Sequence, residues 1–230
     1  YYKQSIKAPA RLEGDVLLVH ENIDQVKEPR AAWVYNAGQR RVRRAPDVAY
    51  DGPGNASDGL RTADDLDLYN GAPDRYDWKL VGKREMYITY NSNKIAGNTI
   101  QYKDLVKPRH LNQELPRYEL HRVWVVESNI RPGTSHTFKK RVFYIDEDGW
   151  NIVAVDAYDN RDELFQFQEG HLIFAHNIQA SSTVPEVIYH FNSGRYFITA
   201  AINEDKPYDL QTTFSSDYFT SASVQKSSTK

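Results

Sequence analysis

The sequence predicts a mainly β protein (α+β class): a strongly curved antiparallel sheet, or incomplete β-barrel, of about ten strands with one or two helices closing it. The first observation is the stretch 139–169, where three apolar and aromatic runs are separated by turn formers at Asp148-Gly149 and Asp159-Asn160. This pattern is typical of a three-stranded meander. The second is composition, because 13% of the residues are aromatic and Met occurs once. That composition favours pleated surfaces over a bundle of long helices.

Ten runs have the apolar content and the flanking turn residues of β-strands. They are 14–21, 31–36, 39–44, 78–90, 118–128, 137–146, 150–158, 163–171, 187–191 and 196–202. Gly82 interrupts the alternation of one run, which predicts a bulged strand there. In the run 150–158, period-two spacing places Trp150, Ile152 and Ala154 on one face and Val153 and Val155 on the other. Apolar side chains are therefore expected on both faces of the sheet.

The remaining segments predict few helices. Ser57 or Asp58 is expected to cap a short helix over 63–69, and one helical turn is expected within 94–115. The Gly- and Pro-rich stretch 47–57 is typical of a long loop. We expect a single domain over 1–214 and a flexible or surface-lying Ser- and Thr-rich tail over 215–230. The start at Tyr1 without Met predicts that the chain is part of a longer precursor.

Charge and composition exclude several classes of protein. The chain has 29 basic and 31 acidic residues, so its overall charge gives no reason to expect nucleic-acid binding. Cysteine is absent, which excludes disulfides and thiolate chemistry. The sequence also lacks a run near the roughly 18 apolar residues that a membrane helix needs, so no transmembrane segment is expected.

The sequence offers no established catalytic or metal-binding motif. Its seven His residues are scattered, without an HExxH pair, so neither a metal site nor a cofactor is predicted. A serine nucleophile elbow is missing as well. The acidic residues from Asp64 to Asp77 could be paired carboxylates of a hydrolase, but their spacing is not diagnostic. A structural role beside Arg61 and Arg75 is the preferred interpretation.

Four stretches carry a resemblance to a known family. They are 30–46 (RAAWVYNAGQRRVRRAP), 70–85 (NGAPDRYDWKLVGKRE), 117–127 (RYELHRVWVVE) and 140–159 (KRVFYIDEDGWNIVAVDAYD). In these, the chain resembles a proteobacterial envelope family of unknown function whose members are often described as outer-membrane lipoprotein-sorting proteins. Its fold is related to those of the lipoprotein carrier LolA and the receptor LolB. The resemblance implies a curved sheet with an apolar interior and a location in the periplasm of a Gram-negative bacterium, and it brings no catalytic residues.

The preferred function is therefore a non-enzymatic carrier or accessory protein that binds a hydrophobic small molecule or acyl chain on the concave face of the sheet. The residues predicted to line this site are Trp33, Tyr35, Trp78, Met86, Trp124, Phe143, Trp150 and Phe165. Two alternatives remain open. One is an enzyme acting on envelope glycans or lipids through Asp64, Asp65, Asp74 and Asp77. The other is a module that docks an envelope transporter or outer-membrane protein.

Overall fold

The structure is a computed structural model that describes residues 1–45, 48, 50–54, 56–176, 179–206, 209 and 211–227. It divides into two compact units: Tyr1–Gly52 with Tyr208–Lys230, and Pro53–Pro207. The single domain expected over 1–214 stays a prediction. The predicted loop 47–57 lies partly outside the described residues.

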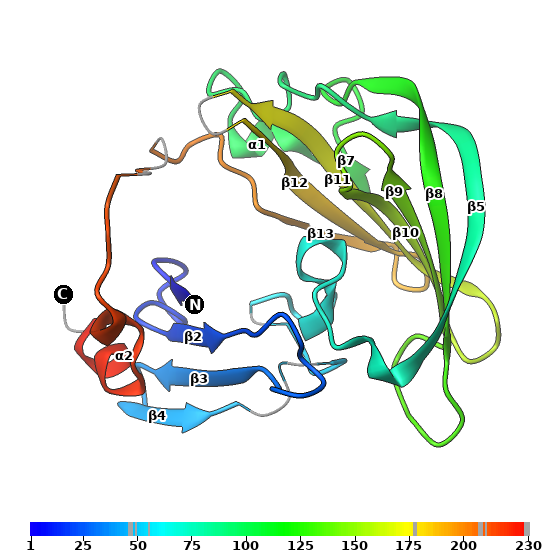
Figure 1. Cartoon of the computed structure of the whole chain (residues 1–230). Helices are drawn as coiled ribbons and strands as arrows, with labels where there is room; N and C mark the ends of the chain where they lie inside the picture. The colour runs from blue at the N-terminus through cyan, green and yellow to red at the C-terminus, as the bar shows by residue number, and fades with distance from the viewer. Residues whose placement is uncertain are drawn as a thin grey trace. The chain divides into compact units, whose positions relative to one another are not determined.

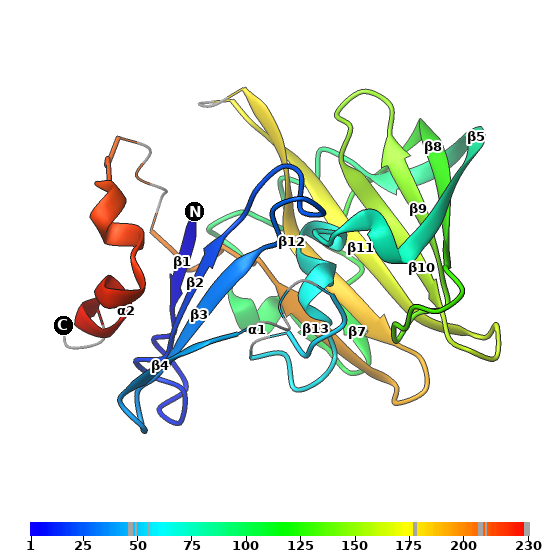
Figure 2. The ribbon, with the colours of Figure 1, turned by 60° about the horizontal axis from the view of Figure 1, so that its bottom comes forward.

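The first unit is a four-stranded antiparallel sheet with the order β1-β2-β3-β4 (Figure 2). Its strands are β1 (Tyr2–Ser5), β2 (Val16–His20), β3 (Ala31–Asn36) and β4 (Arg41–Arg44). The C-terminal stretch forms the 3-10 helix η4 (Ser216–Phe219) and helix α2 (Ser221–Ser227), and α2 packs on β2, β3 and β4. Val224 of α2 is buried together with Val16, Leu18 and Tyr35. Part of the predicted tail therefore completes the core of this unit.

The second unit is built on a seven-stranded antiparallel sheet with the order β13-β12-β11-β10-β9-β8-β5 (Figure 1). Its strands are β5 (Tyr76–Thr89), β8 (Tyr118–Ile130), β9 (Lys140–Asp146), β10 (Ile152–Tyr158), β11 (Leu164–Ala175), β12 (Ala180–His190) and β13 (Arg195–Thr199). Between β5 and β8 lie α1 (Tyr102–Leu105) and a two-stranded ribbon of β6 (Val106–Lys107) and β7 (His110–Leu111). Two 3-10 helices, η2 (Ala63–Leu68) and η3 (Pro73–Arg75), precede β5.

The mainly β class and the antiparallel pairing predicted from sequence are confirmed, and each of the ten predicted strands overlaps an observed one. The additional strands β1, β6 and β7 are only two to four residues long, too short for a clear periodic pattern. The strands fall into three sheets rather than one of about ten. The predicted bulge is also confirmed, because the register of β5 against β8 shifts between Leu80 and Gly82.

Both faces of the seven-stranded sheet bury apolar side chains, as predicted. On the first face, which we call the η2 face, Phe143 and Val155 pack with Leu68 of η2. On the opposite face the core includes Ile88, Val125 and Tyr144. A second bulge, between Ile152 and Ala154 of β10, corrects the predicted alternation. Because of it, Ile152 packs with Val155 in the η2-face cluster, whereas Val153 and Ala154 both belong to the opposite cluster.

The segment between β5 and β8 contributes to the opposite face of the sheet. Ile95, Leu105, Leu111 and Leu115 of this segment are buried against Val187 of β12. Tyr189 of β12 and Tyr196 and Ile198 of β13 pack around the same cluster. The single helical turn predicted within 94–115 is α1. This segment thus supplies side chains that bury part of the opposite face.

Helix η2 lies on the η2 face and begins after Thr62, not after the predicted caps Ser57 or Asp58. The backbone N–H of Thr62 donates to Asp65 Oδ2 at 3.1 Å, while the Ser57 hydroxyl donates to the Gly54 carbonyl. Leu68 approaches β11 closely at Gly170, where an added Cβ would lie 3.0 Å from Leu68 Cδ1 and 2.7 Å from Thr183 Cγ2. The closest contact is with Thr183 of β12, so the absence of a side chain at Gly170 lets both β12 and Leu68 approach β11 this closely.

A buried ionic cluster fixes η2 to the sheet. Arg141 of β9, whose side chain has no exposed surface, donates to Asp64 Oδ2 at 2.9 Å and lies 3.5 Å from Asp65 Oδ1. His136 Nε2 lies 3.0 Å from the same Asp64 oxygen. The Arg141 guanidinium also lies within 4.7 to 5.7 Å of four ring centroids. These rings belong to Tyr69, Tyr76, Phe138 and Phe143.

The two carboxyls of this cluster differ in pKa. Burial acts to raise the pKa of Asp64, but the Arg141 guanidinium and His136 hold it below its ordinary value. Burial and the neighbouring charge of Asp64 raise the pKa of Asp65. Asp65 accepts hydrogen bonds from the side-chain amides of Gln166 and Gln168, at 3.3 and 2.9 Å. One guanidinium thus compensates a carboxylate pair that would otherwise be costly to bury.

Replacing Arg141 alone should strongly destabilise the second unit. We expect Arg141→Met to lower the free energy of unfolding by about 3 to 5 kcal/mol, because Asp64 and Asp65 would remain buried without their cation. The control is Arg131→Met, which removes the half-exposed ion pair with Asp77 and should cost less than about 1 kcal/mol. Urea unfolding would measure both, and equal losses would contradict a structural role for the buried cluster.

A second buried acid should make stability depend on pH. Burial and the neighbouring Asp67 raise the pKa of Glu186 to about 8. The unfolded chain releases this proton near pH 4.3, roughly the ordinary value for Glu. Between these two pH values the folded protein holds one more proton than the unfolded chain. The free energy of unfolding therefore falls as the pH rises from about 4.3 to about 8, and above about 8 the contribution of Glu186 no longer changes.

We therefore expect Glu186→Gln to gain stability relative to the parent as the pH rises from 5 to 8. An amide in place of the carboxyl can still donate to Asp67 and never ionises. The control is Glu114→Gln, at an exposed position, whose stability profile should run parallel to that of the parent. Melting temperatures measured across this pH range would test the expectation. If the difference in melting temperature between Glu186→Gln and the parent does not change with pH, the raised pKa of Glu186 is refuted.

Candidate functional site

The eight residues predicted to contact an apolar ligand lie in different parts of the structure. Trp33 and Tyr35 are in β3 of the first unit, within its core cluster. The other six are in the second unit, where Met86 packs against the opposite-face cluster. Because the bulge at Gly82 reverses the alternation of β5, Met86 faces away from Trp78. Ligand contact at these positions stays a prediction.

The remaining five aromatic residues belong to the η2 face. Trp78 lies 5.5 Å from Phe143, ring centroid to ring centroid. Trp150 stacks on Trp124 at 6.5 Å. Phe165 contacts Phe138, which in turn packs beside Arg141. The predicted aromatic residues therefore gather mainly on the face that η2 partly covers.

Beyond η2 this face exposes a set of apolar side chains on β5, β8 and the β9–β10 turn. We call them the β5–β8 apolar strip: Trp78, Leu80, Tyr87, Leu120, Trp124 and Trp150. Tyr87 and Leu120 are directly opposed in the strand register, and they are 69% and 56% exposed. Leu80 is 61% and Trp150 70% exposed. Apolar groups gathered on an exposed sheet face are typical of binding surfaces.

A charged bridge crosses the middle of the strip. Glu147 in the β9–β10 turn accepts from Lys83 Nζ at 2.5 Å and from Arg122 Nε at 2.6 Å. The Lys83 ammonium lies 4.3 Å from the ring centroid of Trp124. The hydrogen bond from Lys83 holds the pKa of Glu147 below its ordinary value. The strip therefore presents apolar surface around a centre in which two cations share one carboxylate.

The outer edge of β5 lies beside the strip. β5 is the terminal strand of the seven-stranded sheet and is 14 residues long. Among the described residues, no other strand pairs with its outer edge. Lys83, Arg84 and Glu85 place charges along it, a common protection against unwanted edge pairing.

The carboxylates considered for an envelope enzyme do not form an open catalytic pair. Asp64 and Asp65 are 2% and 0% exposed and bind Arg141, whereas Asp77 binds Arg131 at the surface. The structural interpretation of Asp64 and Asp65 is confirmed, but their cation is Arg141 rather than Arg61 or Arg75. Arg141 lies about 75 residues later in the chain, so local spacing could not identify it.

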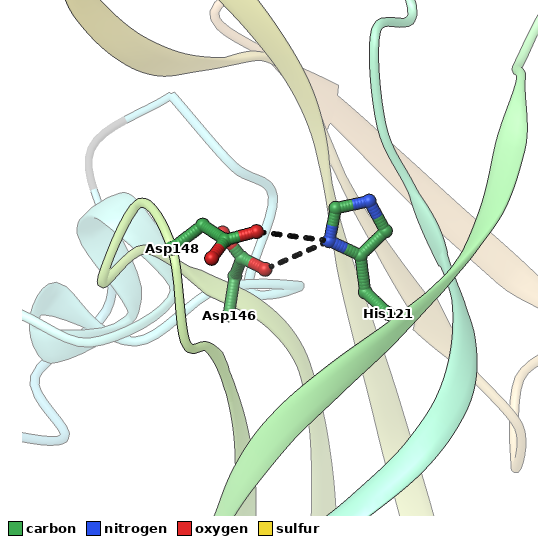
Figure 3. Close-up of side chains that lie close together, drawn as sticks. All are labelled: His121, Asp146 and Asp148. Atoms are coloured by element: carbon green, nitrogen blue, oxygen red, sulfur yellow. Dashed lines mark hydrogen bonds and ion pairs between the residues drawn. The ribbon is translucent and has the colours of Figure 1, made fainter.

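Sequence reasoning missed a second group of side chains, on the opposite face. His121 of β8, Asp146 at the end of β9 and Asp148 in the following turn point toward one another (Figure 3). His121 Nδ1 lies 3.2 Å from Asp146 Oδ1 and 3.7 Å from Asp148 Oδ2. Asp146 is fully buried, whereas the Asp148 side chain is 67% exposed. One potential ligand atom from each residue lies within 4.8 Å of the other two.

Strand pairing brings this group together. Asp146 pairs with Val123, and His121 lies two residues from Val123 on the same strand face. The Tyr90 ring packs on the His121 ring with centroids 4.0 Å apart. Burial, and then the charges of Asp146, Asp148 and Glu119, raise the pKa of Tyr90. The Asp-Glu-Asp-Gly turn was visible in the sequence, but its histidine partner depends on the register of β8 and β9.

Among the described residues, no helix has the length and apolar character needed to cross a bilayer. An uncharacterized protein of Pseudomonas aeruginosa is 53% identical to this chain over 227 residues, which are 98% of the chain and 50% of that protein. The chain therefore spans half the length of this relative.

Two crystal structures share the fold at low sequence identity. A domain from Vibrio parahaemolyticus, named an outer membrane lipoprotein-sorting protein domain, has a TM-score of 0.59 at 13% identity, over 97% of this chain and 76% of that one. A DUF1329 family protein from Desulfovibrio piger has a TM-score of 0.60 at 14% identity, over 96% and 75%. The family model described as "Protein of unknown function (DUF1329)" matches residues 1–225. This match confirms the resemblance found in the sequence, and the chain belongs to the DUF1329 family.

Proposed function

We propose that the chain is part of a non-enzymatic carrier or accessory protein in the periplasm of a Gram-negative bacterium, and that it binds a lipid-like apolar group on the β5–β8 apolar strip. The observation that carries this proposal is the exposure of Leu80, Tyr87, Leu120 and Trp150 on the sheet face that η2 leaves uncovered. Transferring this surface from water to contact with an acyl chain is favourable.

The strip has the chemistry expected of a site for a hydrophobic ligand. Aromatic rings at Trp124 and Trp150 and branched chains at Leu80 and Leu120 offer large contact area. Lys83 and Arg122 stand at the centre and can orient an anionic end group, because the two cations share the single carboxylate of Glu147. A few polar groups within a mostly apolar surface are typical of small-molecule sites.

Similar proteins support the same class of function. The fold is shared with a Vibrio parahaemolyticus domain named for outer membrane lipoprotein sorting, and the P. aeruginosa relative also comes from a Gram-negative bacterium. A role in outer-membrane lipid or lipoprotein trafficking follows as part of the proposal. An envelope transporter or outer-membrane protein is the expected partner.

The alternative, a docking module, is favoured by one specific observation. The outer edge of β5 presents backbone N–H and C=O groups that no strand within the described residues pairs. Such an edge can accept a strand from a partner protein. If the chain is only a docking module, the purified protein should bind no acyl chain. The measurement of acyl-chain binding therefore separates the two functions.

Acyl-chain binding can be measured through the protein's own tryptophans. Bromine atoms on a fatty acid quench Trp fluorescence on contact, and Trp78, Trp124 and Trp150 all lie in the strip. We expect saturable quenching by a brominated fatty acid. Leu120→Asp should weaken binding about tenfold or more, because burying one Leu contributes about 1.5 to 3 kcal/mol.

Leu164→Asp is the matched control, since Leu164 is 41% exposed but lies outside the strip, at the start of β11. The Leu164→Asp variant should bind the brominated fatty acid with the affinity of the parent. Trp150→Phe should reduce the quenching amplitude. Equal affinity in the Leu120→Asp and Leu164→Asp variants, or no saturable quenching in the parent, would refute the proposed site.

A further inference from the structure

We propose that His121, Asp146 and Asp148 bind one divalent transition-metal ion, and that Zn²⁺ matches this ligand set best. The three side chains belong to β8, β9 and the β9–β10 turn (Figure 3). Strand alternation places His121 on the sheet face opposite Trp124 of the β5–β8 apolar strip. This proposal is independent of the carrier function, because it rests on different side chains.

The ligand spacing fits a tetrahedral ion. Zn²⁺ bonds to His nitrogen and carboxylate oxygen are about 2.0 to 2.2 Å long, which separates neighbouring ligand atoms by about 3.3 to 3.6 Å. The observed separations from His121 Nδ1 are 3.2 Å to Asp146 Oδ1 and 3.7 Å to Asp148 Oδ2. The three ligand atoms all lie within 4.8 Å of one another, so side-chain movements of up to about 1.2 Å would bring them to the spacing of a tetrahedral ion.

The donor types select among metal ions. One imidazole nitrogen with two carboxylate oxygens suits Zn²⁺ and its first-row neighbours, whereas Ca²⁺ and Mg²⁺ favour sites made of oxygen alone. Three protein ligands leave a fourth coordination position. Since the Asp148 side chain is 67% exposed, this position is on the side open to solvent.

The local charge balance also calls for a cation. Asp146 has no exposed surface, and within the described residues its only ion-pair partner is His121. A buried carboxylate is costly unless a positive charge compensates it. Two basic side chains near this group have other partners: Arg84 donates to the Tyr144 hydroxyl at 3.2 Å, and Arg117 binds Glu119. The carboxylates around His121 thus create a negative site.

Surrounding groups hold the ligands in place as second-sphere residues do in metal sites. The backbone N–H of Gly149 donates to Asp146 Oδ2 at 2.7 Å, which leaves Oδ1 directed at His121. A Cβ at Gly149 would lie 3.2 Å from this Oδ2 and 2.9 Å from Asn151 Oδ1, so a side chain there would displace one of these polar groups. A metal on Nδ1 leaves the His121 proton on Nε2, which lies 3.9 Å from Glu119 Oε2, a distance longer than a hydrogen bond. A carboxylate is therefore near the outer nitrogen of the imidazole, but a rotation of Glu119 is needed before it can orient the ring.

Zinc binding can be tested on the chain after treatment with a chelator. We expect calorimetric titration with ZnCl₂ to show one ion bound per chain and melting scans to show a higher melting temperature with ZnCl₂, because an ion that binds only the folded state stabilises it. CaCl₂ and MgCl₂ should not reproduce the shift. Co²⁺ in place of Zn²⁺ should show the ligand-field absorption of a tetrahedral site.

Three variants make the test specific. His121→Gln should abolish the zinc-dependent shift, and Asp148→Asn should weaken binding about tenfold or more. Asp148 is exposed, so this variant is expected to fold even if changes at the buried Asp146 do not. His110→Gln, at an exposed histidine on β7, should bind zinc as the parent does.

Two results would overturn the assignment. One is the absence of saturable ZnCl₂ binding and of a melting shift, which would mean that His121 and the carboxylates form an ion pair and nothing more. The other is unchanged affinity in His121→Gln and Asp148→Asn, which would place the bound zinc elsewhere on the surface as an adventitious ion only.

Discussion

The second unit depends on one buried guanidinium. Arg141 projects from the inner strand β9 into a space closed by four aromatic rings and two carboxyls. Both carboxyls come from η2, so the ion pairs hold this helix at one place on the sheet. The cluster is a constraint more than a source of stability, because desolvation of the charges offsets much of their attraction. By fixing the position of η2, the cluster determines which part of the η2 face this helix covers.

That placement leaves the β5–β8 apolar strip exposed. Helix η2 packs on β10 and β11, whereas the strip belongs to the opposite edge of the sheet. An edge strand 14 residues long with exposed apolar side chains is an aggregation hazard in an ordinary monomer. Lys83, Arg122 and Glu147 reduce this hazard while keeping the apolar groups accessible. A surface of this kind is consistent with a protein that receives a hydrophobic partner or ligand.

The strip and the histidine–aspartate group share β8 and the turn that follows β9. Successive residues of a strand point to opposite faces, so Arg122 belongs to the strip and His121 to the metal-ligand group. The β9–β10 turn likewise supplies Glu147 and Trp150 to the strip and Asp148 to the metal-ligand group. An ion on one face would therefore restrain the turn that carries part of the strip on the other face. The two proposals can thus be physically coupled although neither requires the other.

The sequence by itself determined the mainly β class, the ten strands β2 to β5 and β8 to β13, and the bulge at Gly82, because period-two alternation and turn residues are local properties. It also indicated that both faces of the sheet are apolar. Only the tertiary structure decided the partner of Asp64 and Asp65, the meeting of His121 with Asp146 and Asp148, and the side on which Met86 lies. The physical reason is that each of these depends on strand register and bulges. A one-residue shift moves a side chain to the other face of a sheet, and pairing between distant segments leaves no periodic signal in the chain.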